Sequence, residues 1–207
     1  MNIILISLVF LVLFVFLELL KNQVRIQSEY TRKMAHVVSG VIIYFLPSLL
    51  SRNEIVGLAI FFTFFLLFTR YFGLFSSIHK VERKTLGEVY FPLGAGLSAF
   101  YFLPNNLIAF QFGILILALA DTAGGLVGSI FGKHKFLKNK TWEGTSTFFI
   151  TSFLIYIIFI LIPEHGTIYK GLLISLILTT VESVLFLGLD NLFLPIVAAF
   201  LLNFLSH

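Results

Sequence analysis

Uninterrupted apolar runs of helical length constrain this chain more than any other feature of its sequence. Only 12% of its 207 residues are charged, whereas a soluble domain usually carries about 25% charged residues. The runs are continuous and lack the alternation of the roughly ten-residue strands of a membrane barrel. The sequence therefore predicts an all-α, polytopic membrane protein. It contains no cysteine, which excludes disulfides and thiolate metal sites.

Eight apolar stretches approach the roughly 20 residues that a helix needs to cross a bilayer. They cover residues 3–20, 34–50, 55–72, 88–104, 106–124, 145–162, 170–187 and 190–205. Several are short, so we expect about eight transmembrane helices within a range of seven to nine. The sequence shows no internal repeat. Residues 1–207 are therefore interpreted as a single integral-membrane catalytic domain.

The basic residues are distributed unevenly among the predicted loops. All but two of the 14 lie in the first, third and fifth loops, which hold Lys21, Arg25, Arg32, Lys33, Arg70, Lys80, Arg83, Lys84, Lys133, Lys135, Lys138 and Lys140. Cytoplasmic loops carry the excess of lysine and arginine. We therefore expect these three loops to face the cytoplasm and both termini to lie outside.

This orientation gathers polar residues from distant parts of the sequence at the cytoplasmic ends of the predicted helices. The set comprises Arg32, Lys33, His36, Glu88, Asp121, Lys140, Glu143, Glu182, Asp190 and Asn191. Ionisable residues within or beside membrane spans are costly and usually functional. Nucleotides and magnesium are available on that side, so the set predicts one shared site.

The segment from Asp121 to Ser146 concentrates glycines, lysines and hydroxyls beside a carboxylate, and residues 131–147 form its predicted cytoplasmic nucleotide-binding loop. The candidate nucleotide ligands are Gly124, Gly125, Gly128, Gly132, Lys133, Lys140, Thr141, Glu143, Gly144, Thr145 and Ser146. Glycines four residues apart also let two membrane helices pack closely. Because lysines follow them, we favour phosphate binding through backbone N–H groups.

The pair Lys140-Thr141 has the chemistry of a phosphate site without the spacing of a Walker A loop. The lysine can neutralise phosphate charge, and the hydroxyl can bind a phosphate oxygen or a metal. Lys133, Lys135 and Lys138 are also typical of positive-inside loops or of contacts to anionic lipid. Thr145 and Ser146 could instead cap the following helix.

Three carboxylates, those of Asp121, Glu182 and Asp190, form a predicted magnesium site. Magnesium prefers oxygen ligands and is usually bound by one or two carboxylates together with substrate phosphates. Asp121 could otherwise cap a helix, and Glu182 could join two helices by hydrogen bonds. Arg32, Lys33, His36, Glu88 and Asn191 are candidate substrate-binding or supporting residues.

Together these motifs resemble the CTP-dependent lipid-alcohol kinases, a family that includes dolichol kinase, phytol kinase and the CTP-using diacylglycerol kinase. The resemblance covers about residues 30–200. It rests on Arg32-Lys33-x-x-His36, Gly87-Glu88-x-Tyr90-x-Pro92, Asp121-Thr122-Ala123, Lys140-Thr141-x-Glu143-Gly144-Thr145, Glu182 and Asp190-Asn191-x-x-x-Pro195. The motifs are most similar to the dolichol kinase catalytic core.

The resemblance implies a membrane kinase that transfers the γ-phosphate of CTP to the hydroxyl of a dolichol-, polyprenol- or phytol-like alcohol, with Mg²⁺ as cofactor. The implied catalytic residues are Asp121, Lys140, Glu143 and Asp190. A diacylglycerol kinase or a lipid-phosphate cytidylyltransferase is the alternative. The His-Gly-Gly and Asp-Arg-x-Asp segments typical of the cytidylyltransferases are absent, which favours phosphoryl transfer.

A proton- or cation-coupled transporter is a competing class, because intramembrane carboxylates can carry protons or bind ions. Such proteins often contain two repeated halves with broken spans, and this sequence shows no such symmetry. The stripe of small residues is also compatible with a homodimer. We expect CTP, a lipid alcohol and the bilayer as partners, and no nucleic acid.

Overall fold

The computed structural model describes residues 2–79, 85–137, 140–163 and 166–206. The elements are α1 (Asn2–Val24), α2 (Ser28–Phe45), η1 (Leu46–Ser48), α3 (Arg52–Tyr71), α4 (Ser76–His79), α5 (Gly87–Phe102), α6 (Leu107–Leu115), η2 (Ile116–Asp121), α7 (Thr122–Phe131), β1 (Lys135–Leu137), β2 (Lys140–Thr141), α8 (Trp142–Tyr156), η3 (Ile157–Leu161), α9 (Ile168–Val184) and α10 (Asp190–Ser206). Four basic residues of the predicted cytoplasmic loops lie outside the described residues: Lys80, Arg83, Lys84 and Lys138.

Each of the eight predicted apolar runs forms a helix in the described parts of the chain. Four helices are long and apolar enough to cross a membrane, namely Asn2–Val24, Arg52–Tyr71, Leu107–Phe131 and Trp142–Leu161, and Asp190–Leu205 is a shorter apolar helix. These helices support a polytopic membrane protein. The number of eight crossings stays a prediction.

The fifth helix is longer than predicted and places Asp121 inside it rather than at its end. Residues Leu107–Phe131 form one continuous rod of α6, η2 and α7, in which η2 is a π-helical segment. Such π segments inside helices occur frequently at functional sites. The helix therefore continues past the predicted boundary at residue 124, and the alternative in which Asp121 caps a helix end is wrong.

The nucleotide-loop segment contains a short hairpin that the purely α-helical prediction did not include. Strands β1 and β2 pair antiparallel, with Lys135 opposite Thr141. The Trp142 ring stacks on Phe136 with ring centroids 4.6 Å apart. Helix α8 then begins at Trp142, because the Thr141 side chain caps it by accepting from the Gly144 N–H. Thr145 and Ser146 lie inside the helix and do not cap it.

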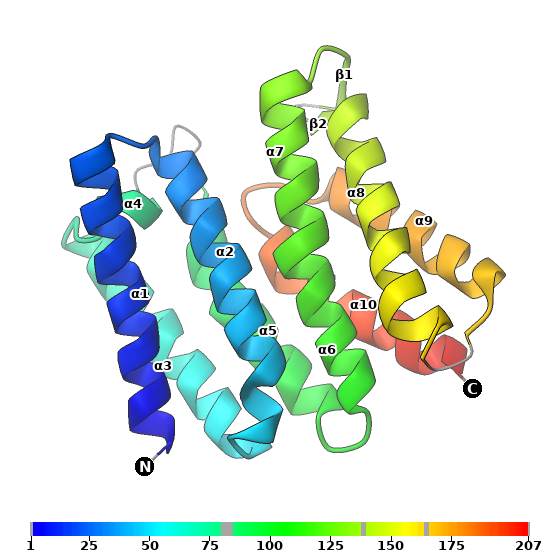
Figure 1. The fold of residues 1–207 in the computed structure, drawn as a ribbon, viewed down its shortest axis with the longest axis horizontal. Coiled ribbons are helices and arrows are strands. Elements are labelled where there is room, and N and C mark those ends of the chain that lie inside the picture. Colours follow the sequence, from blue (N-terminus) through cyan, green and yellow to red (C-terminus); the bar gives the residue numbers. More distant parts are fainter. Residues whose placement is uncertain (1, 80–84, 138–139, 164–165, 207) are drawn as a thin grey trace.

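Helices α1 and α2, the rod of α6, η2 and α7, and α8 run between two ends of the molecule, whereas α9 and α10 lie obliquely to them (Figure 1). The two termini lie toward the same end, and the α1–α2 connection and the hairpin lie toward the other. Which end faces the cytoplasm stays a prediction. One apolar core joins α1, α2, α3 and α5 to one side of α6 and η2, and a second joins α8, α9 and α10 to the other side of α6 and η2. The candidate active site lies where the helices of these two cores meet.

Candidate active site

A cavity of about 740 Å³, named the polar cavity for the charged side chains in its wall, opens between α2, η2, α7, the start of α8 and the α9–α10 connection. It is built from segments far apart in the sequence, because the rod of α6, η2 and α7 lies between α2 and α8 (Figure 1). The predicted site residues that line it are Arg32, Lys33, His36, Asp121, Gly124, Gly125, Gly128, Lys140, Thr141, Gly144, Thr145, Glu182, Asp190 and Asn191. Ligand pockets usually enclose roughly 300–1,000 Å³.

Lys140 is the cationic centre of this cavity. Its ammonium forms an ion pair and hydrogen bond with the Glu182 carboxylate, and Asp190 Oδ2 lies 4.0 Å from its Nζ. Burial by itself would lower the pKa of Lys140, but the neighbouring carboxylates of Glu182, Asp121 and Asp190 outweigh burial, so the pKa is raised above 10.5. Lys140 therefore carries a positive charge at neutral pH.

Asp121 lies on the cavity wall at the end of η2 and interacts electrostatically with Asp190, Lys140 and Glu182. The structure thus brings together the three carboxylates predicted to bind metal, with the lysine beside them. Glu182 is buried, and its Oε2 has no hydrogen-bond partner among the described residues. That free acceptor can bind a cation or donor brought by a ligand.

The described residues contain no group of three or more acidic or histidine side chains arranged to hold a metal by themselves. Magnesium is usually held by one or two carboxylates plus phosphate oxygens and water. The donor set around Asp121, Glu182 and Asp190 fits that mode, in which the nucleotide completes the coordination. It does not form a protein-only metal cage.

Three of the predicted phosphate-binding glycines are helix-packing residues. A Cβ on Gly144 would lie 2.8 Å from the Gly124 carbonyl oxygen and 3.0 Å from Gly128 Cα. Gly124 and Gly128 lie within α7, so they do not form the predicted loop. Their lack of side chains lets α7 and α8 touch, which brings the Thr141-capped start of α8 to the cavity wall.

Gly125 has a different environment from its neighbour. It is exposed on α7, and a Cβ there would lie 2.8 Å from Lys33 Nζ. The Lys33 ammonium on α2 therefore lies over α7 at the side of the cavity, 3.9 Å from Glu29 Oε1. The crossing of α2 and α7 thus adds a second cation to the cavity wall.

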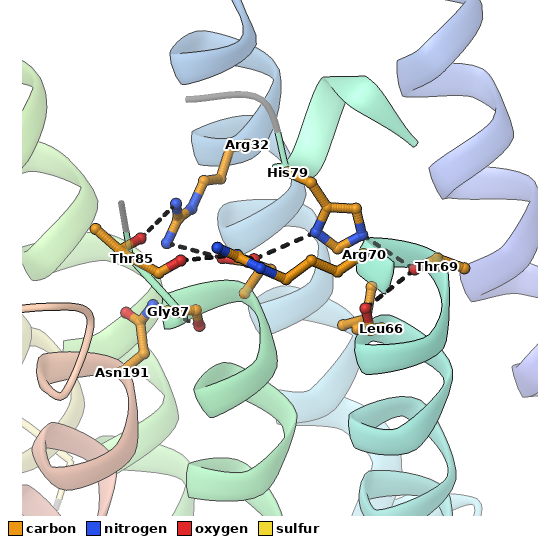
Figure 2. Close-up of polar contacts among 9 residues, drawn as sticks. Arg32, Leu66, Thr69, Arg70, His79, Thr85, Gly87 and Asn191 are labelled. Atoms are coloured by element: carbon orange, nitrogen blue, oxygen red, sulfur yellow. Dashed lines mark hydrogen bonds and ion pairs between the residues drawn. The ribbon is translucent and has the colours of Figure 1, made fainter. Parts of the chain in front are cut away.

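Glu88 is buried behind the cavity and contacts two arginines and a histidine. Figure 2 shows Arg32, Arg70 and His79 converging from separate segments. Arg32 Nη2 lies 3.5 Å and His79 Nδ1 lies 3.2 Å from the Glu88 carboxylate, and Arg70 also pairs with it. Glu88 is thus a supporting residue that fixes Arg32 at the cavity.

Arg70, His79 and Thr85 were not identified as site residues from the sequence. Thr85 Oγ1 accepts from Arg32 Nη1 at 2.8 Å, and Arg70 donates to the Thr85 carbonyl oxygen at the same distance. Arg70 was counted only as a topology signal, and no local pattern distinguished the other two. Asn191 was predicted as a supporting residue, and its Nδ2 donates to the Gly87 carbonyl oxygen at 2.8 Å.

Five predicted site residues do not line the cavity within the described parts of the chain: Glu88, which lies behind it, and Gly132, Lys133, Glu143 and Ser146. The Glu143 carboxylate instead lies 2.7 Å from His134 Nδ1 and accepts from the His134 backbone N–H. Gly132 packs against the Thr141 side chain. The nucleotide-loop segment therefore contributes its second strand and the helix start, rather than its whole length.

Comparison with known proteins decides the family of the chain. The sequence pattern of the cytidylyltransferase family matches residues 1–185. The chain belongs to this family. Phytol kinase of Synechocystis sp. is 27% identical over 190 residues, which cover 88% of this chain and 82% of the relative. An uncharacterized protein of Methanocaldococcus jannaschii is 32% identical over 188 residues, covering 84% and 93% of the two chains.

These matches confirm the resemblance to the CTP-dependent lipid-alcohol kinases that the sequence motifs indicated. No solved structure matches this member of the cytidylyltransferase family.

Proposed function

We propose that this protein is a membrane kinase that transfers the γ-phosphate of CTP to the hydroxyl of an isoprenoid alcohol. The observation that carries the proposal is the cavity that gathers Lys140 and three carboxylates from four segments of an otherwise apolar protein. Its family and its similarity to a protein named phytol kinase support a CTP-dependent lipid kinase. The choice of a dolichol-, polyprenol- or phytol-like alcohol belongs to the proposal.

Phosphoryl transfer depends mainly on positioning and on neutralising the phosphate charge. In the proposed reaction the alcohol oxygen bonds to the γ-phosphorus, the bond to the β–γ bridging oxygen breaks, and CDP leaves. Lys140 would bind the phosphates after exchanging its Glu182 partner for them. Lys33 and Arg32 would add positive charge from the opposite wall.

Magnesium is the cofactor that the three carboxylates would hold, with Asp121 and Asp190 as ligands and Glu182 nearby. When bound, it would supply charge neutralisation for the phosphate oxygens. The hydroxyl proton goes to a carboxylate of the cavity wall. Asp190 lines the cavity and would accept this proton through the carboxylate oxygen that does not bind the metal, whereas Glu143 faces His134 outside the cavity.

The position of the label in CTP tests the kinase against the cytidylyltransferase alternative. Purified protein is incubated with magnesium and a panel of phytol, polyprenol, dolichol, diacylglycerol and phosphatidic acid, with either γ- or α-labelled CTP. A kinase moves only the γ-label to an alcohol and releases CDP. Transfer of the α-label to phosphatidic acid would instead establish a cytidylyltransferase, and transfer of neither label would refute both.

A further inference from the structure

A second cavity, of about 60 Å³, lies among α1, α2, α3 and α5 and has an almost entirely apolar wall. Phe10 and Phe14 of α1 and Phe62 of α3 form much of this wall. Its polar lining residues are His36, Ser39 and Glu88. His36 and Ser39 are separated by one turn of α2, so they lie on one face of it. This cavity therefore has one polar end.

His36 joins the two cavities. It is the residue that the described linings of the polar and the apolar cavity have in common. Its ring lies against Phe91 with centroids 4.7 Å apart. Its Nε2 is buried and has no hydrogen-bond partner in the described part of the chain. A buried polar group without a partner costs free energy, so a ligand hydroxyl at this point would be stabilising.

The volume of the apolar cavity limits what it can hold. A water-sized group needs about 10–15 Å³ of such space, so 60 Å³ accommodates about four to six of them. That is room for one isoprene unit, but not for the ester-bearing backbone of a diacylglycerol. Ester carbonyls would also be left without donors against phenylalanine and leucine side chains.

We propose that the apolar cavity binds the hydroxyl-bearing isoprene unit of a single-chain lipid alcohol, and that His36 orients the hydroxyl toward the polar cavity. The imidazole Nε2–H donates to the alcohol oxygen, and the hydroxyl faces the phosphates. The rest of the tail leaves between the helices into the bilayer. This inference rests on the proposed kinase function for its reaction, but its binding site can be tested separately.

Filling the cavity from two walls provides the kinetic test. Ser39→Leu on α2 and Ala95→Leu on α5 both add a side chain to the apolar wall. Gly57→Leu on α3 is the matched control, since a Cβ there meets nothing within 4 Å. In the two cavity-filling variants, Ser39→Leu and Ala95→Leu, we expect KM for phytol to rise at least tenfold, while KM for CTP stays within twofold of the wild-type value. The control should have wild-type KM values for both substrates. Equal KM values in all three would overturn the proposal.

His36 is tested by its own pair of variants. His36→Leu removes the donor and should lower kcat/KM for the alcohol at least thirtyfold without changing KM for CTP. His36→Gln retains an N–H donor and should recover part of that loss. Equal losses in both variants, or a loss that falls equally on CTP, would show that His36 does not orient the alcohol.

A binding measurement separates this inference from the kinase proposal. Farnesol with a diazirine in its first isoprene unit should crosslink to α1, α3 or α5 in wild type and Gly57→Leu, but weakly in Ser39→Leu and Ala95→Leu. This crosslinking pattern in a protein without any kinase activity would refute the proposed function but support the proposed binding site. If the protein is an active kinase but Ser39→Leu and Ala95→Leu do not reduce the crosslinking, the proposed binding site alone would be refuted.

Discussion

Lys140 is the residue on which the chemistry of the polar cavity most depends. Lys140→Met removes the ion-pair partner of the buried Glu182 carboxylate and should reduce phosphate transfer at least a hundredfold, a loss of about 2.7 kcal/mol of transition-state stabilisation. Lys135→Met, on the exposed face of the hairpin, is the control and should retain activity. Initial rates with γ-labelled CTP measure both. Comparable losses in the two variants would indicate a general effect of loop charge.

The raised pKa of Lys140 also predicts how its ion pair responds to pH. A group whose pKa is raised on folding stabilises the native state below its ordinary pKa, here 10.5, and loses that contribution only as the pH rises through the higher value. The difference in melting temperature between wild type and Lys140→Met should therefore not shrink between about pH 6 and about pH 9. A difference that shrinks across this range would contradict a charged Lys140.

Glu88 is the second residue with a large expected effect, but on stability. It is 3% exposed, so Glu88→Ala would leave Arg32, Arg70 and His79 without their carboxylate. Removing one partner from a buried ion pair costs about 3–5 kcal/mol. Thermal unfolding in detergent measures the loss. Glu54→Gln is the control, because glutamine preserves the capping box at the exposed start of α3.

The contact between α7 and α8 is the element that builds one wall of the site. Gly144→Val would place a Cβ too close to the Gly124 carbonyl oxygen and to Gly128. Overpacking of this kind costs about 1–3 kcal/mol, and separating the helices would also displace Thr141. We expect a lower melting temperature together with weaker CTP binding. Gly57→Val should change neither, since its site is open.

Sidedness is a property of the whole molecule and follows from the charge distribution. The chain has no cysteine, so an introduced cysteine is the single site that a maleimide can label, at either end of the molecule. Lys135→Cys on the hairpin should react with an impermeant maleimide only from the cytoplasmic side. Asn53→Cys at the start of α3 should react only from outside. Both positions are exposed, and labelling of both from one side would refute the predicted topology.

Local sequence determined the helices and much of the set of residues that line the cavity. Apolar runs of helical length form helices wherever they can bury their surface, so all eight predicted runs are helical. Asp121, Lys140, Glu182 and Asp190 could be identified because charges near lipid are rare and costly. The residues that support them could not, because a basic residue such as Arg70 also serves as an ordinary topology signal.

Only the tertiary structure decided what each polar residue contacts. Glu143 and Lys140 are close in sequence, yet one faces His134 and the other faces Glu182, because strand β2 and the start of α8 point them in different directions. Gly124 and Gly125 are adjacent, yet one packs on α8 and the other lies under Lys33. The sequence by itself determined the helices and the charges at their ends. The contacts between polar side chains and the shape of the cavity depend on how helices that are distant in sequence pack together, and no local sequence pattern specifies that packing.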